Sequence, residues 1–195
     1  RGIYAEHIAE YTPTNNGNPY FTFRLGDLWG IVLDCGEDKP DDHPEYGNTI
    51  CFSYFRKKET RFLEQVVQNA EHEYKAEGVR RRVAICHVPF THILPPPFDI
   101  EQELYGEWAR LVREYIKPEL LLYGHHHVVD ICPVGSDFDH QGQACTAIIG
   151  SRPTFANADH PNGFVGAGIV LRDDGKKRII FNNDKGEVLR DEVID

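Results

Sequence analysis

Three consecutive histidines follow directly on a short apolar run in the middle of the chain. Residues 120–123 are Leu-Leu-Leu-Tyr, bounded by a proline and a glycine, which predicts a short buried strand. His125, His126 and His127 come next. In extended backbone, residues two apart point the same way, so we expect His125 and His127 to converge and His126 to face elsewhere. Neutral imidazole is the commonest metal ligand, so this loop is predicted to supply half of a metal site; the alternative is a solvated surface loop.

Another histidine lies at the end of a second predicted strand. Residues 83–86 form a short apolar run, and His87 follows at once, before Val88 and Pro89. Open α/β sheets place their ligands at the carboxyl ends of strands, so His87 is predicted to be a metal ligand like His125 and His127. For His87 alone, a core histidine that hydrogen-bonds to backbone would be the better interpretation. His92, in the same loop, is a weaker candidate for substrate contact.

Two helices and several strands are predicted to position these residues. Apolar spacing predicts helices over residues 60–77, with Thr60 as N-cap and Gly78 as stop, and over residues 101–116, which Pro118 ends. A turn-rich loop is expected between residues 34 and 50. Asp-Gly and Lys-Gly turns in the C-terminal stretch predict hairpins. The predicted strands, besides the two above, are 20–25, 29–34, 144–149, 166–171, 178–181 and 188–193. The fold class is therefore mixed α/β (α+β), as one domain over residues 1–195 that ends in a β-meander.

Composition narrows the class of protein. The chain has 195 residues, of which 41% are hydrophobic and 27% charged, as in an ordinary globular domain. Its net charge of −10 argues against a nucleic-acid partner, and no stretch approaches a membrane span. The five cysteines show no paired spacing, so reduced thiols are predicted. Because the chain begins at Arg1 and contains no Met, we expect its natural start to lie elsewhere, and the compartment is indicated only by a slight preference for the cytoplasm.

The order of these motifs resembles the C-terminal half of a calcineurin-like metallophosphoesterase. The matching elements are a strand with His87-Val-Pro89, a helix, a strand with Gly124-His-His-His127, and the β-meander. Upstream, Trp29-Gly-Ile-Val-Leu-Asp34 and the helix that carries Phe62 and Leu63 resemble the segment before the His-x-Pro motif. The resemblance covers nearly the whole chain and implies a four-layer αββα sandwich, with two β-sheets packed face to face.

The resemblance also implies a site and a reaction. Two metal ions (Mn, Fe or Zn) would lie at the strand ends and promote in-line hydrolysis of a phosphoester. His87 and His125 would bind one ion and His127 the other. No catalytic residue beyond these metal ligands is assigned to this chain.

Other ligands of the family pattern have no convincing match. The family needs an N-terminal Asp-x-His, a Gly-Asp with the bridging carboxylate, and a Gly-Asn-His. Asp41-Asp-His43 matches the first by letters, Gly26-Asp27 the second, and Gly47-Asn48 the third without its His. Their order is wrong, and each lies in a segment better explained as a turn. We therefore expect the missing ligands to precede Arg1.

The leading hypothesis is a metal-dependent phosphatase or phosphodiesterase that is active only with its N-terminal half. The alternatives are a non-catalytic metal-binding or protein-interaction domain derived from that fold, and a β-rich binding domain whose histidines only satisfy hydrogen bonds. The partners expected are a phosphoester substrate and a polypeptide that covers a sheet edge. Because strands 83–86 and 120–123 are apolar on both faces, we expect the absence of that half to open an edge beside them, covered by the half itself or by a second copy.

Overall fold

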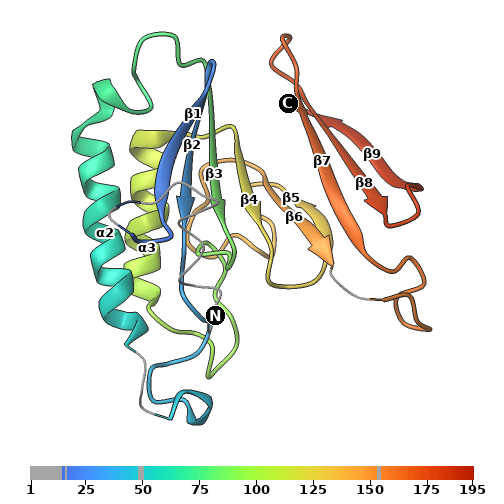
Figure 1. The fold of residues 1–195 in the computed structure, drawn as a ribbon, viewed down its shortest axis with the longest axis horizontal. Coiled ribbons are helices and arrows are strands. Elements are labelled where there is room, and N and C mark those ends of the chain that lie inside the picture. The colour runs from blue at the N-terminus through green and yellow to red at the C-terminus, as the bar shows by residue number, and fades with distance from the viewer. Residues whose placement is uncertain (1–14, 16, 48–50, 153–154) are drawn as a thin grey trace.

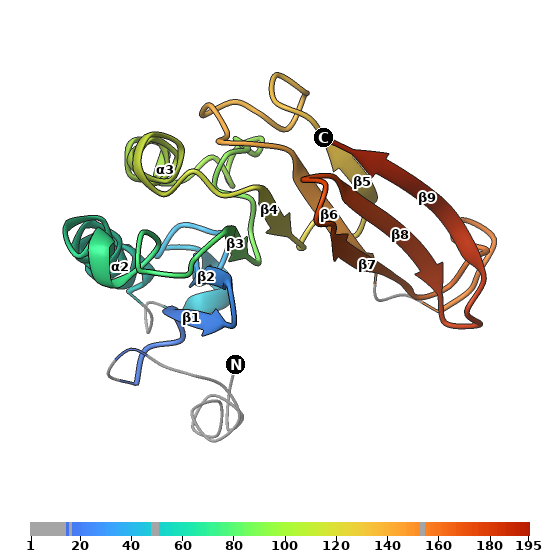
Figure 2. The ribbon, with the colours of Figure 1, turned by 90° about the horizontal axis from the view of Figure 1, so that it is seen from above.

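The computed structural model describes residue 15 and residues 17–47, 51–152 and 155–195. As predicted, this part is a mixed α/β fold, with helices on one face of a sheet and a C-terminal meander on the other side (Figures 1 and 2). The helices are α2 (Phe52–Gln68) and α3 (Gln102–Leu111), which a π-helical turn continues (Val112–Ile116), with short 3-10 turns at Pro44–Tyr46 and Ala70–His72. The strands are β1 (Phe21–Leu25), β2 (Leu28–Leu33), β3 (Arg81–Cys86), β4 (Leu120–Tyr123), β5 (Val129–Cys132), β6 (Ala147–Arg152), β7 (Val165–Leu171), β8 (Lys177–Asn183) and β9 (Val188–Ile194).

The strands follow one continuous path. Its order is β1-β2-β3-β4-β6-β7-β8-β9, with β5 paired to β6. Strands β2, β3, β4 and β6 are parallel to one another, whereas β1, β5 and the meander pair antiparallel. The expectation of an open edge beside residues 83–86 and 120–123 is wrong, because β3 and β4 are both paired on both sides. In the described chain the path ends at β1 and β9 instead.

Adjacent residues of β4 face two separate cores. Leu121 and Tyr123 belong to the core under the helices, which contains Trp108. Leu120 packs on the other side, in a second core with Ile179 and other meander residues. A strand buried on both faces needs a continuous apolar run, which explains why this segment shows no alternation. The layers are thus helices, parallel sheet and meander; the second helix layer of a four-layer sandwich is not formed by the residues described.

Helix α2 begins at Phe52, so the predicted N-cap Thr60 is wrong. The Asp41 carboxylate accepts hydrogen bonds from the backbone N–H groups of Phe52 and Ser53, at 2.8 and 3.2 Å. The cap therefore comes from the preceding loop, not from an adjacent residue, and local sequence spacing does not reveal it. Thr60 lies inside the helix, where its hydroxyl donates to the backbone of the previous turn and accepts from Trp108 Nε1 at 2.8 Å.

The same helix ends at Gln68 and not at Glu77. A 3-10 turn and further turns follow, and Tyr74 stays buried, with its ring centroid 5.7 Å from that of Trp29. The apolar spacing continues past the helix because these turns keep Tyr74 against the core. Gly78 ends the segment with φ of +80°, which suits a stop residue.

Most remaining elements agree with the sequence. The helix over 101–116 is present, although its last turn is π-helical, and both meander hairpins are confirmed. Strand β5 was not predicted, and β6 begins at Ala147 instead of residue 144. The five cysteines are free, as predicted. Among the described residues, no helix has the length and apolar character to cross a bilayer.

Candidate functional site

The loops after β2, β3 and β4 meet at one edge of the sheet. Leu33, Cys86 and Tyr123 lie side by side in register at the ends of the three parallel strands. The segments that follow them therefore emerge together, and two of these begin with His87 and with the turn that carries His125. Parallel pairing is thus what brings distant parts of the sequence to one place.

His87 and His125 face each other at this edge. Their ring centroids are 5.4 Å apart, and the ring planes are nearly perpendicular, at 86°. The N–H of Gly124 donates to the backbone oxygen of His87 at 3.0 Å, and a Cβ on Gly124 would lie only 3.1 Å from His87 Nδ1. The His87 side chain is exposed, and that of His125 is 24% exposed. Gly124 therefore leaves the space that allows the two accessible imidazoles of His87 and His125 to approach each other.

Residues 124–127 form a tight turn and not the extended segment predicted. His125 and His127 have φ of +66° and +53°, and the N–H of His126 donates to the Gly124 backbone oxygen at 2.8 Å. The left-handed region costs an L-residue with a Cβ about 1–2 kcal/mol. In the described chain, only four residues other than glycine have positive φ, and two of them are predicted metal ligands. Such strain collects at functional sites, which motivates a functional role for this turn.

His126 packs into a cluster of aromatic rings. Its ring centroid lies 5.0 Å from that of His92 and 5.3 Å from that of Phe138, and His92 in turn lies 4.8 Å from His140. Burial, followed by the charges of neighbouring histidines, lowers the pKa of His126 to about 4. Burial and then His140 also lower the pKa of His92. Both rings are therefore neutral at neutral pH, and a role for His92 in substrate contact stays a prediction.

Asp38 is a neighbour of the site that sequence reasoning missed. Its Oδ2 lies 3.2 Å from His125 Nε2, and its Oδ1 lies 3.0 Å from Lys39 Nζ. Burial on its own would raise the pKa of this carboxyl, but the hydrogen bond and charge of Lys39, together with His125, hold the pKa below its usual value. The one feature of the sequence that could have indicated Asp38 is its position in the loop that follows β2, a strand parallel to β3 and β4.

Two buried side chains of α2 anchor the start of the Asp38 loop. Arg56 Nε donates to the backbone oxygen of Cys35 at 2.8 Å, and its Nη2 donates to that of Glu37 at 2.5 Å. Glu59 Oε1 accepts from the N–H of Asp34 at 2.7 Å. Arg56 is 1% exposed and Glu59 is 0% exposed. Buried polar groups are retained where they form hydrogen bonds, and these bonds account for Arg56 and Glu59 inside α2.

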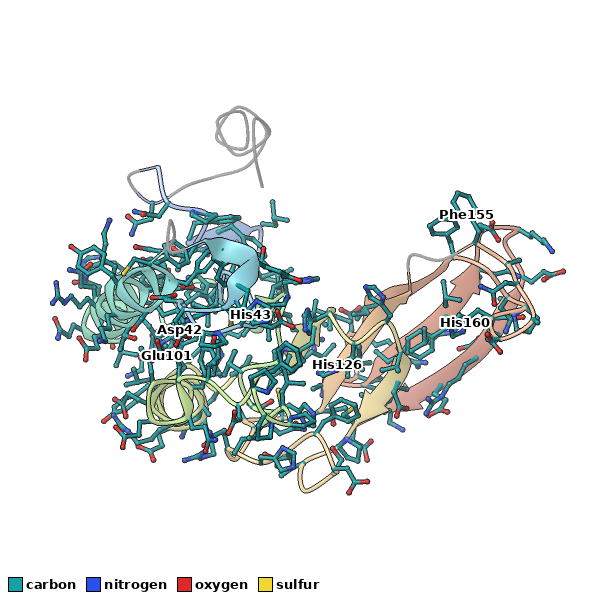
Figure 3. The ribbon with its side chains drawn as sticks, turned by 90° about the horizontal axis from the view of Figure 1, so that it is seen from below. Asp42, His43, Glu101, His126, Phe155 and His160 are labelled. Carbon is teal, nitrogen blue, oxygen red and sulfur yellow. The ribbon has the colours of Figure 1, made fainter. Side chains whose placement is uncertain are left out.

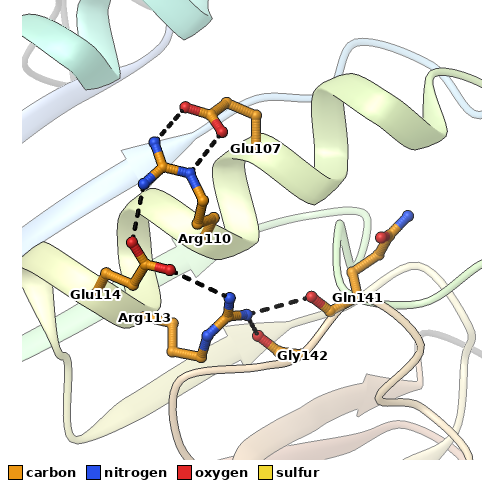
Figure 4. Close-up of polar contacts among 6 residues, drawn as sticks. All are labelled: Glu107, Arg110, Arg113, Glu114, Gln141 and Gly142. Carbon is orange, nitrogen blue, oxygen red and sulfur yellow. Dashed lines mark hydrogen bonds and ion pairs between the residues drawn. The ribbon is translucent and has the colours of Figure 1, made fainter.

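A second anchor holds the loop that contains His140. Arg113, in the π-helical turn after α3, donates to the backbone oxygens of Gln141, at 3.3 Å, and of Gly142 (Figure 4). Gly142 has φ of +79°, and a Cβ there would meet Arg113 Nη1 at 2.5 Å. The ion pairs beside this anchor join Glu107, Arg110, Arg113 and Glu114.

The three upstream letter matches have structural roles. The backbone oxygen of Asp27 accepts hydrogen bonds from the N–H groups of Arg80 and Arg81, at 2.9 and 3.1 Å. Asp41 caps α2, as described above. Gly47 holds a left-handed conformation after a 3-10 turn, and Asn48 lies outside the described residues. Asp27 and Gly47 thus lie in turns, as predicted, whereas Asp41 caps a helix, which was not predicted.

The donor atoms at the sheet edge fit part of a metal shell. Within the described ranges, no group of three or more His, Cys, Asp or Glu side chains is arranged to hold an ion. His127 is exposed. However, His87 and His125 approach across the space that Gly124 leaves, and the Asp38 carboxylate lies beside His125. Imidazole and carboxylate together suit Mn, Fe or Zn.

Solved structures with a similar fold are phosphatases. The chain matches a purple acid phosphatase from seeds of yellow lupin (Lupinus luteus) with a TM-score of 0.52 and 12% identity, over 94% of this chain and 34% of that one. It matches a dimetal phosphatase from Danio rerio with a TM-score of 0.50 and 12% identity, over 90% of this chain and 60% of that one. The fold of the chain is therefore similar to that of these two phosphatases. At this identity the likeness concerns the fold alone, and neither a family model nor a curated protein sequence matches the chain.

Proposed function

We propose that the chain is the C-terminal portion of a metal-dependent phosphoester hydrolase domain, with His87 and His125 as ligands of one ion and His127 as a ligand of a second. The observation that carries this proposal is the approach of His87 and His125 at the ends of adjacent parallel strands. The strained turn at His125 and His127 and the fold of two phosphatases support it.

The residues at this edge of the sheet have different roles in the proposed reaction. When bound, two ions of Mn, Fe or Zn would supply positive charge to the phosphoryl oxygens and lower the pKa of the attacking water. The chain carries a net charge of −10, so an anionic substrate needs such local positive charge. His87 and His125 present accessible imidazoles, and Gly124 permits their approach. The low pKa of His126 keeps that ring neutral beside them.

We further propose that an N-terminal portion, preceding Arg1, completes the coordination. A groove lies along the ends of β2, β3 and β4, is lined by Val32, Ile85 and Leu122 among others, and reaches His87 and Gly124. The meander packs on β4, β5 and β6 (Figure 2). The apolar lining and the greater length of both similar phosphatases support a covering polypeptide.

A second copy of this chain is the other candidate to cover the groove, and it is tested in the same way. Sedimentation of residues 1–195 at several concentrations is expected to show self-association, or binding of the upstream polypeptide when it is added. A strictly monomeric chain that folds cooperatively and does not bind the upstream polypeptide contradicts the half-domain proposal.

Hydrolysis of 4-nitrophenyl phosphate and of its bis ester tests the activity. Residues 1–195 alone are expected to show background rates with Mn²⁺ or Zn²⁺, and the longer polypeptide to show turnover. In the longer polypeptide, His87→Ala is expected to lower the rate by roughly a hundredfold or more, because a ligand of the ion is lost. His160→Ala is the matched control, since His160 lies in the C-terminal part, well apart from His126 (Figure 3). Turnover by residues 1–195 alone contradicts the half-domain proposal, and an inactive longer polypeptide that binds metal favours the non-catalytic alternative.

A further inference from the structure

Two buried cysteines are in contact at the edge of the sheet that carries His87. The sulfur atoms of Cys35 and Cys86 lie 3.3 Å apart, and the Cys35 sulfur also lies 3.6 Å from the backbone oxygen of Val88. The two cysteines are 1% and 2% exposed, respectively. They are 51 residues apart in the chain, and the spacing of the five cysteines shows no pairs. The fold alone therefore creates this contact.

Backbone contacts hold both cysteines in place. Cys86 is the last residue of β3, which pairs with a parallel strand on each side. The backbone oxygen of Cys35 accepts a hydrogen bond from Arg56 Nε at 2.8 Å. The N–H of the preceding residue, Asp34, donates to Glu59 Oε1 at 2.7 Å. Because the two thiols are held together in this way, each is present at a high effective concentration beside the other.

A disulfide bond between these sulfurs needs only a small movement and a small oxidant. The bond is about 2.05 Å long, so the sulfurs must approach by roughly 1 Å. With hydrogen peroxide, one sulfur attacks a peroxide oxygen, the O–O bond breaks, and a sulfenic acid and water form. The second sulfur then attacks the sulfenic sulfur, the S–O bond breaks, and a second water leaves with the remaining thiol proton. The two sulfurs together lose two electrons, which reduce the peroxide to water.

We propose that Cys35 and Cys86 are a redox-active pair, whose reversible disulfide joins the end of β3 to the loop that follows β2. His87 comes directly after Cys86, and Asp38, beside His125, comes three residues after Cys35. The bond therefore acts on the sheet edge from two sides. Thiol–disulfide exchange with a thiol such as dithiothreitol reverses it. This inference goes beyond the proposed function and needs no bound ion.

Peptide mapping of residues 1–195 after oxidation tests the pairing. The reduced chain is treated with hydrogen peroxide, the remaining thiols are alkylated, and disulfide-linked peptides are measured by mass spectrometry. Because both thiols are buried, we expect the link to form slowly. We also expect the Cys35–Cys86 link to exceed every other pairing by about tenfold or more, because the fold holds these thiols together. Dithiothreitol should remove the link.

Two controls separate selection by the fold from chance pairing. The same chain unfolded in urea should lose the preference for the Cys35–Cys86 link. Cys51→Ser removes the exposed cysteine and is expected to leave the link unchanged. Oxidation of Cys51 without a Cys35–Cys86 link overturns the proposal, since the two thiols would then only fill space in the core. Equal pairing in the folded and the unfolded chain overturns it as well.

Imidazole signals in nuclear magnetic resonance spectra test the effect on the sheet edge. The signals of His87 should shift when the link forms and return when dithiothreitol removes it. The signals of His160, in the C-terminal part, should not change. A link that leaves the His87 signals unchanged overturns the action on this edge. No metal ion is added in these experiments, so their outcome is independent of the proposed metal centre.

Discussion

The parallel and antiparallel parts of the described chain bury their strands differently. In β4, Leu121 faces the helix-covered core and Leu120 faces the meander, so both sides of the strand are apolar and buried. In the meander, Ile179 and Phe181 are buried, whereas Val193 on the neighbouring strand is 49% exposed. Parallel strands also end at one edge, whereas antiparallel strands divide their ends between two edges. This difference explains why the candidate ligands lie together at the ends of the parallel strands. The meander contributes to the fold by packing against them.

The largest expected difference concerns matched leucines in the two parts. Leu121→Ala, at a fully buried position in β4, is expected to lower the free energy of unfolding by about 2–5 kcal/mol, because a core cavity is created. Leu189→Ala in β9, where the side chain is 39% exposed, is expected to cost less than about 1 kcal/mol. Urea unfolding of both variants measures the difference. Equal losses would contradict the burial of Leu121 in a closed core and the exposure of Leu189 on the meander.

The next largest effect concerns two arginines in ion pairs. Arg56→Ala is expected to destabilise the fold by about 2–4 kcal/mol, because it leaves buried carbonyls and Glu101 without their partner. Arg178→Ala removes an exposed pair with Asp191 in the meander and is expected to change little. Thermal melting of the two variants compares them, and a similar shift for both contradicts the anchoring role of Arg56.

A smaller effect is expected at His125, where two substitutions should differ in stability although both should lose metal binding. Because φ is +66° at this position, His125→Gly should be more stable than His125→Ala by about 1 kcal/mol. Both variants should lose metal binding. At His160 in the C-terminal part, glycine is expected to give no such advantage over alanine. Denaturant titration of the four variants is the measurement, and an advantage for alanine at position 125 contradicts the strained turn.

The last expected effect is a change in pH dependence at His126, which concerns only the stability below about pH 6.5. Its pKa is about 4 in the fold and about 6.5 when unfolded, so between these values the unfolded state binds more protons. Its contribution is therefore present above about pH 6.5 and is lost as the pH falls towards 4. In metal-free protein, His126→Phe should make this decline shallower, whereas His160→Phe should not. Urea midpoints across this range test it, and an unchanged decline in His126→Phe contradicts the assignment.

The sequence predicts the parallel part and its histidines better than the elements that position them. Runs buried on both faces identified β3 and β4, and the residues that follow them led to the prediction of His87 and His125 as ligands, whose rings lie near each other. The start of α2 could not be read locally, because its cap is the distant Asp41 and its first turns bury Arg56 and Glu59 where apolar residues are expected. Non-local contacts of this kind leave no periodic signal.

The local geometry around the candidate ligands could not be predicted from the sequence. Alternation in an extended backbone suggested that His125 and His127 converge, but both hold left-handed conformations that periodicity does not encode. Asp38 looked like a turn residue, because aspartate is common in turns for independent reasons. Only the register between β2, β3 and β4 shows that its loop reaches the same edge as His125.

The central claim is that His87, His125 and His127 bind metal, and imidazole nitrogen signals in a nuclear magnetic resonance titration with Zn²⁺ test it most directly. We expect the imidazole signals of these three histidines to shift when Zn²⁺ is added, because metal ligation takes up a ring nitrogen. The signals of His72 and His160, on other parts of the chain, should stay unchanged. A titration in which the signals of His87 and His125 do not change, or in which only His92 and His140 respond, would contradict the proposed site.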